Sequence, residues 1–85
     1  MKLTLKYFAS LRETLGAGGP IDWTPDPEPT AAALRAWLRT QSDAHALALA
    51  PGRAVRVAID QALADESATL RDGAEVAFFP PVTGG

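Results

Sequence analysis

The chain has 85 residues, a net charge of −2 and no cysteine. A chain of this length predicts one domain with a modest hydrophobic core. Without cysteine, disulfides, thiolate metal sites and thiol nucleophiles are excluded. The eight basic residues are scattered along the sequence, so we expect no nucleic-acid binding. No apolar run approaches the ~20 residues of a membrane span and no signal peptide is visible, so we expect a cytoplasmic protein without a membrane partner.

The first predicted element is a half-buried strand over residues 2–9. Leu3, Leu5 and Tyr7 alternate with polar residues, which is the period of a strand with one face in the core. Phe8 departs from this pattern because it is a large apolar side chain on the polar face.

A short helical turn is predicted over residues 10–15, with Ser10 as its N-cap. A brief strand is predicted over residues 21–24. The three prolines within residues 25–29 then prevent both a helix and a strand ladder, so this segment is expected to be a loop.

The main helix is predicted over residues 31–41, with Thr30 as its N-cap. Helical spacing gives it a buried apolar stripe of Leu34, Trp37 and Leu38. Arg35 and Arg39 lie one turn apart and are expected to point to solvent. A second short helix is predicted over residues 44–50, where Ser42 or Asp43 supplies the cap.

Two further strands complete the pattern, one over residues 55–60 and the last over residues 75–79. Leu63 falls on a turn or a short edge strand after the first of them. The order β-β-α-β-β predicts an α+β, two-layer β-grasp (ubiquitin-like) fold, in which one main helix packs on one face of a mixed sheet. The first and last strands are expected side by side in the sheet centre. Residues 1–85 would form a single domain with a flexible C-terminal tail over 80–85.

An apolar patch is expected on the face of the sheet that points away from the helix. If Leu3, Leu5 and Tyr7 face the helix, then Phe8 and Phe79 face outward. The same face would hold two small residues and an adjoining leucine, namely Ala58, Ala77 and Leu63. Contiguous exposed apolar surface typically marks a partner site. The alternative is that the strand ends bend and Phe8 or Phe79 enters the core.

The chain ends on a strand, two prolines and a glycine-tipped tail, Val82-Thr83-Gly84-Gly85. Because glycine has no Cβ, its backbone can enter a narrow channel and its carbonyl can be approached closely. This suits a terminal carboxylate that another enzyme activates. The plainer interpretation is a loose terminus or a linker remnant.

No other residue offers catalytic chemistry. His45 has no neighbouring ligand set and is expected to be solvated or lightly packed. The adjacent acids Asp65 and Glu66 are expected to be solvated, and the remaining acids lack metal-ligand spacing. No motif for phosphate binding, zinc or a nucleophile–base pair is present.

The segment Val76-Ala77-Phe78-Phe79-Pro80-Pro81-Val82-Thr83-Gly84-Gly85 resembles the C-terminal signature of the molybdopterin synthase small-subunit (sulfur carrier) family, which is ubiquitin-like. Tyr7-Phe8-Ala9 with Leu11-Arg12-Glu13, and Asp72-Gly73 before the last strand, are similar to other parts of that family. The resemblance spans essentially the whole chain.

The resemblance implies a mechanism. An ATP-dependent adenylyltransferase, similar to ubiquitin-activating enzymes, would adenylate the Gly85 carboxylate, which then becomes a thiocarboxylate. The tail, Thr83, Gly84 and Gly85, would enter the large subunit of a heterotetramer and deliver sulfur to cyclic pyranopterin monophosphate. Phe8, Leu63 and Phe79 match the family's partner-binding surface. The chain itself would bind no cofactor or metal, and would act as a cosubstrate as much as an enzyme.

Three alternatives stay open at this point. The same carrier chemistry could serve thiamin synthesis or tRNA thiolation. The chain could be a β-grasp adaptor that undergoes no terminal chemistry, or a modifier that forms isopeptide bonds with other proteins.

Overall fold

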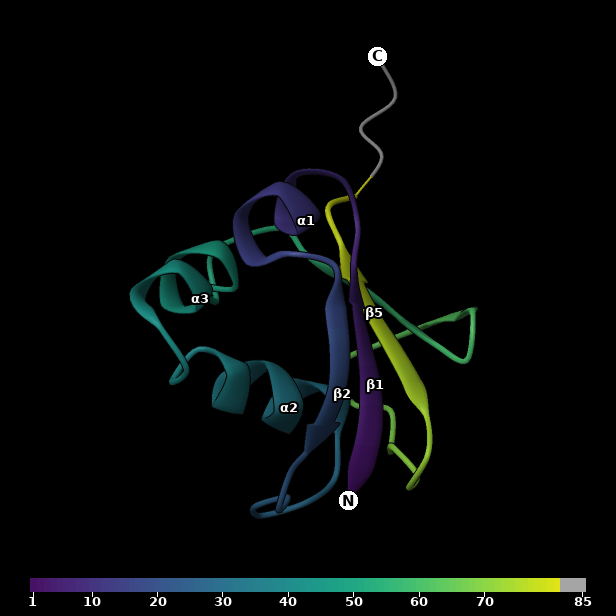
Figure 1. Cartoon of the computed structure of the whole chain (residues 1–85). Coiled ribbons are helices and arrows are strands. Elements are labelled where there is room, and N and C mark those ends of the chain that lie inside the picture. The colour runs from purple at the N-terminus through teal and green to yellow at the C-terminus, as the bar shows by residue number, and fades with distance from the viewer. Residues whose placement is uncertain (82–85) are drawn as a thin grey trace.

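The computed structural model describes residues 1–81, which form a five-stranded mixed sheet with helices on one side (Figure 1). The strands are β1 (Lys2–Tyr7), β2 (Gly18–Asp22), β3 (Arg56–Ile59), β4 (Ala62–Ala64) and β5 (Glu75–Phe79). The helices are α1 (Ala9–Leu15), α2 (Ala31–Leu38) and α3 (Asp43–Ala48).

The strands run in the order β2-β1-β5-β3-β4, so the first and last strands lie side by side in the centre of the sheet, as expected. They are parallel, with Leu5 opposite Val76 and Tyr7 opposite Phe78. The other three pairings are antiparallel. This arrangement confirms the β-grasp prediction and carries the end of β5 out of the middle of the sheet.

The core lies between the sheet and the helices. The alternating residues of β1 and β5 point into it, and Phe78, Val76 and Leu34 are fully buried there. Trp23 is buried as well, and its ring lies 6.4 Å from that of Trp37, which is only partly buried at the edge of the core. Burial of such side chains stabilises the fold by about 1.5–3 kcal/mol each.

The start of the first helix differs from the sequence expectation. It begins at Ala9, with Phe8 at the N-cap position and no side-chain cap, and Ser10 lies within the helix. The predicted Ser10 cap is therefore wrong. The helix begins one residue earlier than expected because Phe8 is the point of change between sheet and helix. Its amide donates a hydrogen bond to the Phe78 carbonyl of the sheet, and its carbonyl accepts the first helical hydrogen bond, from the Arg12 amide.

The second strand is also displaced: it covers Gly18–Asp22 rather than residues 21–24. Gly18 pairs with Lys6 and has φ +95. A Cβ at this position would lie 2.3 Å from the Leu5 carbonyl oxygen, so a glycine is required for the two strands to pair here. Gly16 forms the C-cap of α1, whereas Gly18 and Gly19 begin the edge strand.

The helix caps follow the prediction more closely. The Thr30 hydroxyl accepts from the Ala33 amide at 3.1 Å, and α2 ends at Leu38, three residues earlier than predicted. Ser42 caps α3 by accepting from the His45 amide at 3.1 Å. Asp43 is then the first helical residue.

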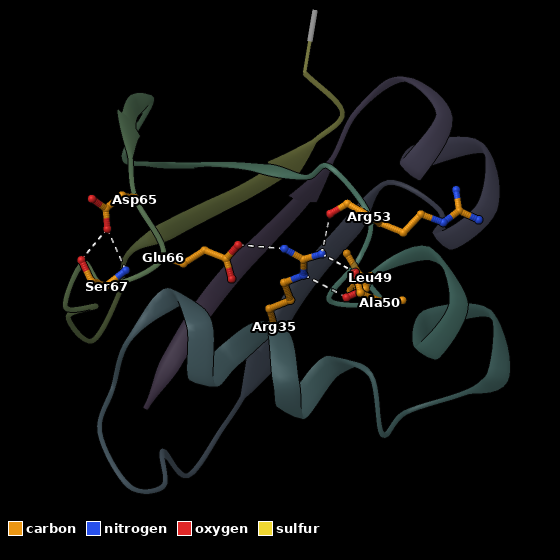
Figure 2. A network of polar contacts seen from close by, with 7 residues as sticks. All are labelled: Arg35, Leu49, Ala50, Arg53, Asp65, Glu66 and Ser67. Carbon is orange, nitrogen blue, oxygen red and sulfur yellow. Dashed lines mark hydrogen bonds and ion pairs between the residues drawn. The ribbon is translucent and has the colours of Figure 1, made fainter.

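Arg35 corrects another expectation, because it is buried rather than directed to solvent. Figure 2 shows its guanidinium enclosed by the carbonyls that follow α3 and by Glu66. Nε donates to the Leu49 carbonyl at 2.9 Å, and Nη2 donates to those of Ala50 and Arg53 at 2.6 and 3.0 Å. The helical spacing of the sequence predicts an exposed position for Arg35, because a sequence does not show which loop carbonyls need a hydrogen-bond donor.

Candidate functional site: the outer groove at the root of the tail

The outer face of the sheet carries a groove at the end from which the chain leaves β5. Strand pairing places Ala77 between Lys6 on β1 and Ala58 on β3, so two small side chains lie next to each other on this face. Together with the larger residues around them, they form the floor of a groove of about 500 Å³. We refer to it below as the outer groove.

Two phenylalanines and a proline form the apolar walls of the outer groove. Phe8 is 44% exposed and Phe79 is partly buried, and both line the groove together with Pro80. The alternative that the strand ends bend and take these rings into the core is therefore wrong for both. Their outward position follows from the strand period, because their neighbours Tyr7 and Phe78 take the core side.

Leu63 lies on the same face, one strand further out. It is 68% exposed and stands opposite Ala58 in the β3–β4 pair. It adjoins the outer groove without lining it. The structure thus brings Phe8 and Phe79 together and leaves Leu63 at the margin, on a three-residue edge strand.

The end of the groove away from Pro80 is polar. Lys6 and Glu75 meet there with 3.1 Å between Nζ and Oε1. Gln61, in the β3–β4 turn, lines the same end. These are the only charged residues that line the groove within the described part of the chain, and they neutralise each other.

The groove extends to the C-terminal end of the described residues. Pro80 lines it, and Pro81 is the last residue that the structure describes. The predicted tail residues Thr83, Gly84 and Gly85 lie outside the described residues.

The other polar residues considered in the sequence analysis, His45, Asp65 and Glu66, make local hydrogen bonds or ion pairs within the fold. The Nδ1 atom of His45 is 2.7 Å from the Ser42 hydroxyl. Hydrogen bonds from the side chain and then from the backbone of Ser67 lower the pKa of the Asp65 carboxyl. Glu66 pairs with Arg35 (Figure 2). Within residues 1–81 no group of three or more His, Asp or Glu side chains is placed to hold a metal ion, and no helix is long and apolar enough to cross a membrane.

The Tyr7 ring is in the core, as predicted. Its hydroxyl is also buried and has no hydrogen-bond partner among residues 1–81. Burial raises the pKa of Tyr7 to about 12. A hydroxyl that holds its proton this strongly is no base at neutral pH, so it belongs to the core and adds nothing to the chemistry of the groove.

Sequence reasoning missed Gln61 and Ala9 as residues of the groove. Both have positive φ, at 69° and 53°, although neither is a glycine. The position of Gln61 was hard to predict, because Asp60-Gln61 is not one of the dipeptides that are typical of two-residue hairpin turns.

The model of the ThiS family matches residues 5–85 of this chain. The chain belongs to the ThiS family. The matched region of this ThiS-family chain includes the outer groove as well as the terminal glycines.

Named relatives agree over nearly the full length. The chain is 46% identical over 79 residues to the molybdopterin synthase sulfur carrier subunit of Escherichia coli (strain K12), which covers 93% of this chain and 94% of that protein. It is 41% identical over 83 residues to the protein of the same name from Haemophilus influenzae, covering 98% of this chain and 99% of the relative.

The fold is shared with solved structures. The solution structure of the HVO 2177 protein of Haloferax volcanii matches with a TM-score of 0.74 and 33% identity, over 100% of this chain and 87% of that protein. The β-grasp architecture of this ThiS-family chain is therefore a known arrangement of strands and helices.

Proposed function

We propose that this chain is the sulfur carrier subunit of a molybdopterin synthase, with its reactive group at the carboxyl terminus of Gly85. The observation that carries the proposal is the continuity of the outer groove with the tail: Phe79 and Pro80 line the groove, and the chain has only five residues after Pro80. A protein that grips this groove would hold Gly85 near its own active site. The names of the two bacterial relatives support the same function.

The terminal chemistry begins with ATP. The Gly85 carboxylate attacks the α-phosphorus of ATP on an activating adenylyltransferase, pyrophosphate leaves, and an acyl-adenylate forms. A sulfur donor then supplies sulfide, the acyl–oxygen bond to AMP breaks, and a thiocarboxylate remains. Activation is needed because a carboxylate oxygen is a poor leaving group. Glycines at the last two positions leave the acyl carbon open to attack.

The loaded carrier then docks on the large subunit of the synthase. Phe8 and Phe79 supply apolar surface, with Leu63 beside them, and Thr83, Gly84 and Gly85 enter the active site. The thiocarboxylate sulfur attacks a side-chain carbon of cyclic pyranopterin monophosphate, and the carbon–oxygen bond at that carbon breaks so that its oxygen substituent leaves. Hydrolysis of the resulting thioester returns the Gly85 carboxylate and leaves the sulfur on the pterin. Two such deliveries build the dithiolene. Groups that move protons are supplied by the large subunit, and the complete assembly is a heterotetramer.

The proposal is tested by intact-mass spectrometry and reconstitution. Incubation with the adenylyltransferase, ATP and a sulfur source should increase the mass by the difference between sulfur and oxygen at Gly85. The loaded chain should then form dithiolene when mixed with the large subunit and the precursor. A chain extended by one alanine after Gly85, or Gly84→Val, should fail, whereas Gly52→Ala, at an exposed and open position, should react as the wild type.

Other outcomes would identify the alternatives. A thiocarboxylate that supports thiamin or tRNA thiolation but not dithiolene formation would replace the product and keep the carrier chemistry. Attachment of Gly85 to lysines would identify a protein modifier. No modification with any adenylyltransferase would favour an adaptor. If the extended chain still delivered sulfur, a free carboxylate at Gly85 would not be required and the assignment of the reactive group to Gly85 would be wrong.

A further inference from the structure

The two-residue turn between β3 and β4 adopts a backbone conformation that is strained for residues other than glycine. Asp60 and Gln61 both have positive φ, at 50° and 69°, as in a type I′ turn. Glycine is preferred at the second central position, because a side chain there is strained. The chain instead carries a long polar side chain at that position.

Asp60 has a clear structural purpose, but Gln61 has none. The Asp60 side chain accepts from the Glu75 amide at 3.0 Å, and its own amide donates to the Glu75 carbonyl at 2.9 Å. These two bonds fix the turn to the start of β5. Gln61 is exposed, and its side-chain amide makes no hydrogen bond within residues 1–81. Gln61 does line the polar end of the outer groove.

The charges of the groove restrict what can occupy it. Lys6 and Glu75 pair at 3.1 Å, so an occupant next to them meets a neutral surface. Gln61 then offers an uncharged donor and an uncharged acceptor side by side, which match a peptide group. The opposite end is lined by Pro80, which the last five residues of the chain follow in the sequence, so we take the occupant to be the protein that receives those residues.

We propose that Gln61 is a specificity-determining residue of the outer groove: its amide hydrogen-bonds the backbone of an uncharged segment of the large subunit, which places an apolar side chain over Ala58 and Ala77. This inference rests on the proposed function, since it takes the tail-receiving large subunit as the occupant. Residues with strained backbone are concentrated at functional sites, and Ala9, on the other side of the groove, has positive φ as well.

The proposal is tested with Gln61→Gly, because glycine relaxes the turn while it removes the amide. The thermal midpoint of the chain should rise by about 2–6 °C. The Kd for the purified large subunit should increase by about 3–10-fold, the range expected for loss of neutral hydrogen bonds. Gln41→Ala removes the same group from an exposed position outside the groove and should leave the Kd unchanged.

The outcomes separate this inference from the proposed function. If Gln61→Gly is more stable and binds the large subunit as the wild type does, Gln61 is only a turn residue and the inference is wrong, while the carrier function stands. If the wild-type chain itself does not bind the large subunit, the proposed function fails and this assignment fails with it. Gln61→Asn, which keeps the amide and tolerates positive φ, should bind more tightly than Gln61→Gly.

Discussion

Arg35 on α2 and Glu66 in the segment after β4 form an ion pair with 2.8 Å between Nη1 and Oε2 (Figure 2). The pair belongs to a larger clamp, because the same guanidinium also holds three backbone carbonyls between α3 and β3. β3 forms part of the groove floor through Ala58, so the clamp ties the main helix to the segment that enters the binding face.

The clamp predicts that removing Arg35 lowers the free energy of unfolding much more than removing the charge of Glu66. Arg35→Met should lower the free energy of unfolding by about 3 kcal/mol, because buried carbonyls lose their donor. Glu66→Gln should cost less than about 1 kcal/mol, since the Glu66 side chain is 41% exposed and water can replace it. Urea denaturation measures both. Arg71→Ala, at an exposed turn position, is the control and should change stability by less than about 0.5 kcal/mol. Equal effects of Arg35→Met and Arg71→Ala would contradict the clamp.

Replacing the adjacent residues Phe78 and Phe79 by alanine should have different effects, the first on stability and the second mainly on binding. Phe78 is fully buried, so Phe78→Ala should cost about 3–5 kcal/mol of stability. Phe79 is only partly buried at the groove wall, so Phe79→Ala should cost about 1 kcal/mol and mainly weaken binding to the large subunit. Denaturation together with titration against the large subunit distinguishes the two. Unfolding of the Phe79→Ala chain by several kcal/mol would show that its ring belongs to the core.

Tyr7 predicts a specific alkaline instability. Its pKa is raised to about 12 in the folded chain, above the ordinary value of 10.0, so the unfolded chain releases this proton first. The associated stability is complete below pH 10 and is lost as the pH rises toward 12. Tyr7→Phe should abolish this loss and be neutral or stabilising by about 1 kcal/mol at pH 7, because the hydroxyl has no hydrogen-bond partner among residues 1–81.

The chain contains one tyrosine, so the absorbance of tyrosinate reports this group alone. Paired denaturation curves of the wild type and Tyr7→Phe between pH 9 and pH 12 cancel the contribution of the lysines. Titration of the folded wild type at the ordinary pKa of a tyrosine would refute the buried hydroxyl.

A side chain at Gly18, on the edge strand β2, should destabilise the fold. Gly18→Ala should lower stability by at least about 2 kcal/mol, because the new Cβ would meet the Leu5 carbonyl and φ is +95. Gly16→Ala has open space and φ +86, so only the backbone strain of about 1 kcal/mol applies. Gly52→Ala has neither problem and should be neutral or slightly stabilising. A tolerated Gly18→Ala would mean that β1 and β2 do not approach as closely as described.

Several features were determined by the sequence itself. The period of two in the first and last strands assigns Phe8 and Phe79 to the outer face, since successive side chains of a strand point to opposite faces and Tyr7 and Phe78 take the core face. Thr30, and the pair Ser42-Asp43, indicated in the sequence where two helices begin, because such side chains accept hydrogen bonds from backbone amides that a helix leaves free. In the structure, Thr30 and Ser42 accept these bonds. The terminal glycines are equally plain in the sequence. These are local relationships, set by residues within a few positions of each other.

Only the tertiary structure decided the rest, because it depends on contacts between segments far apart in the chain. Arg35 is buried because loop carbonyls 14 to 18 residues away converge on it. Gly18 is needed because of a carbonyl on β1, and Gln61 faces the groove because Asp60 fixes its turn to β5. Local periodicity determines which face a residue takes, whereas the position of a donor, a carbonyl or a turn across the sheet is set by the pairing of distant strands.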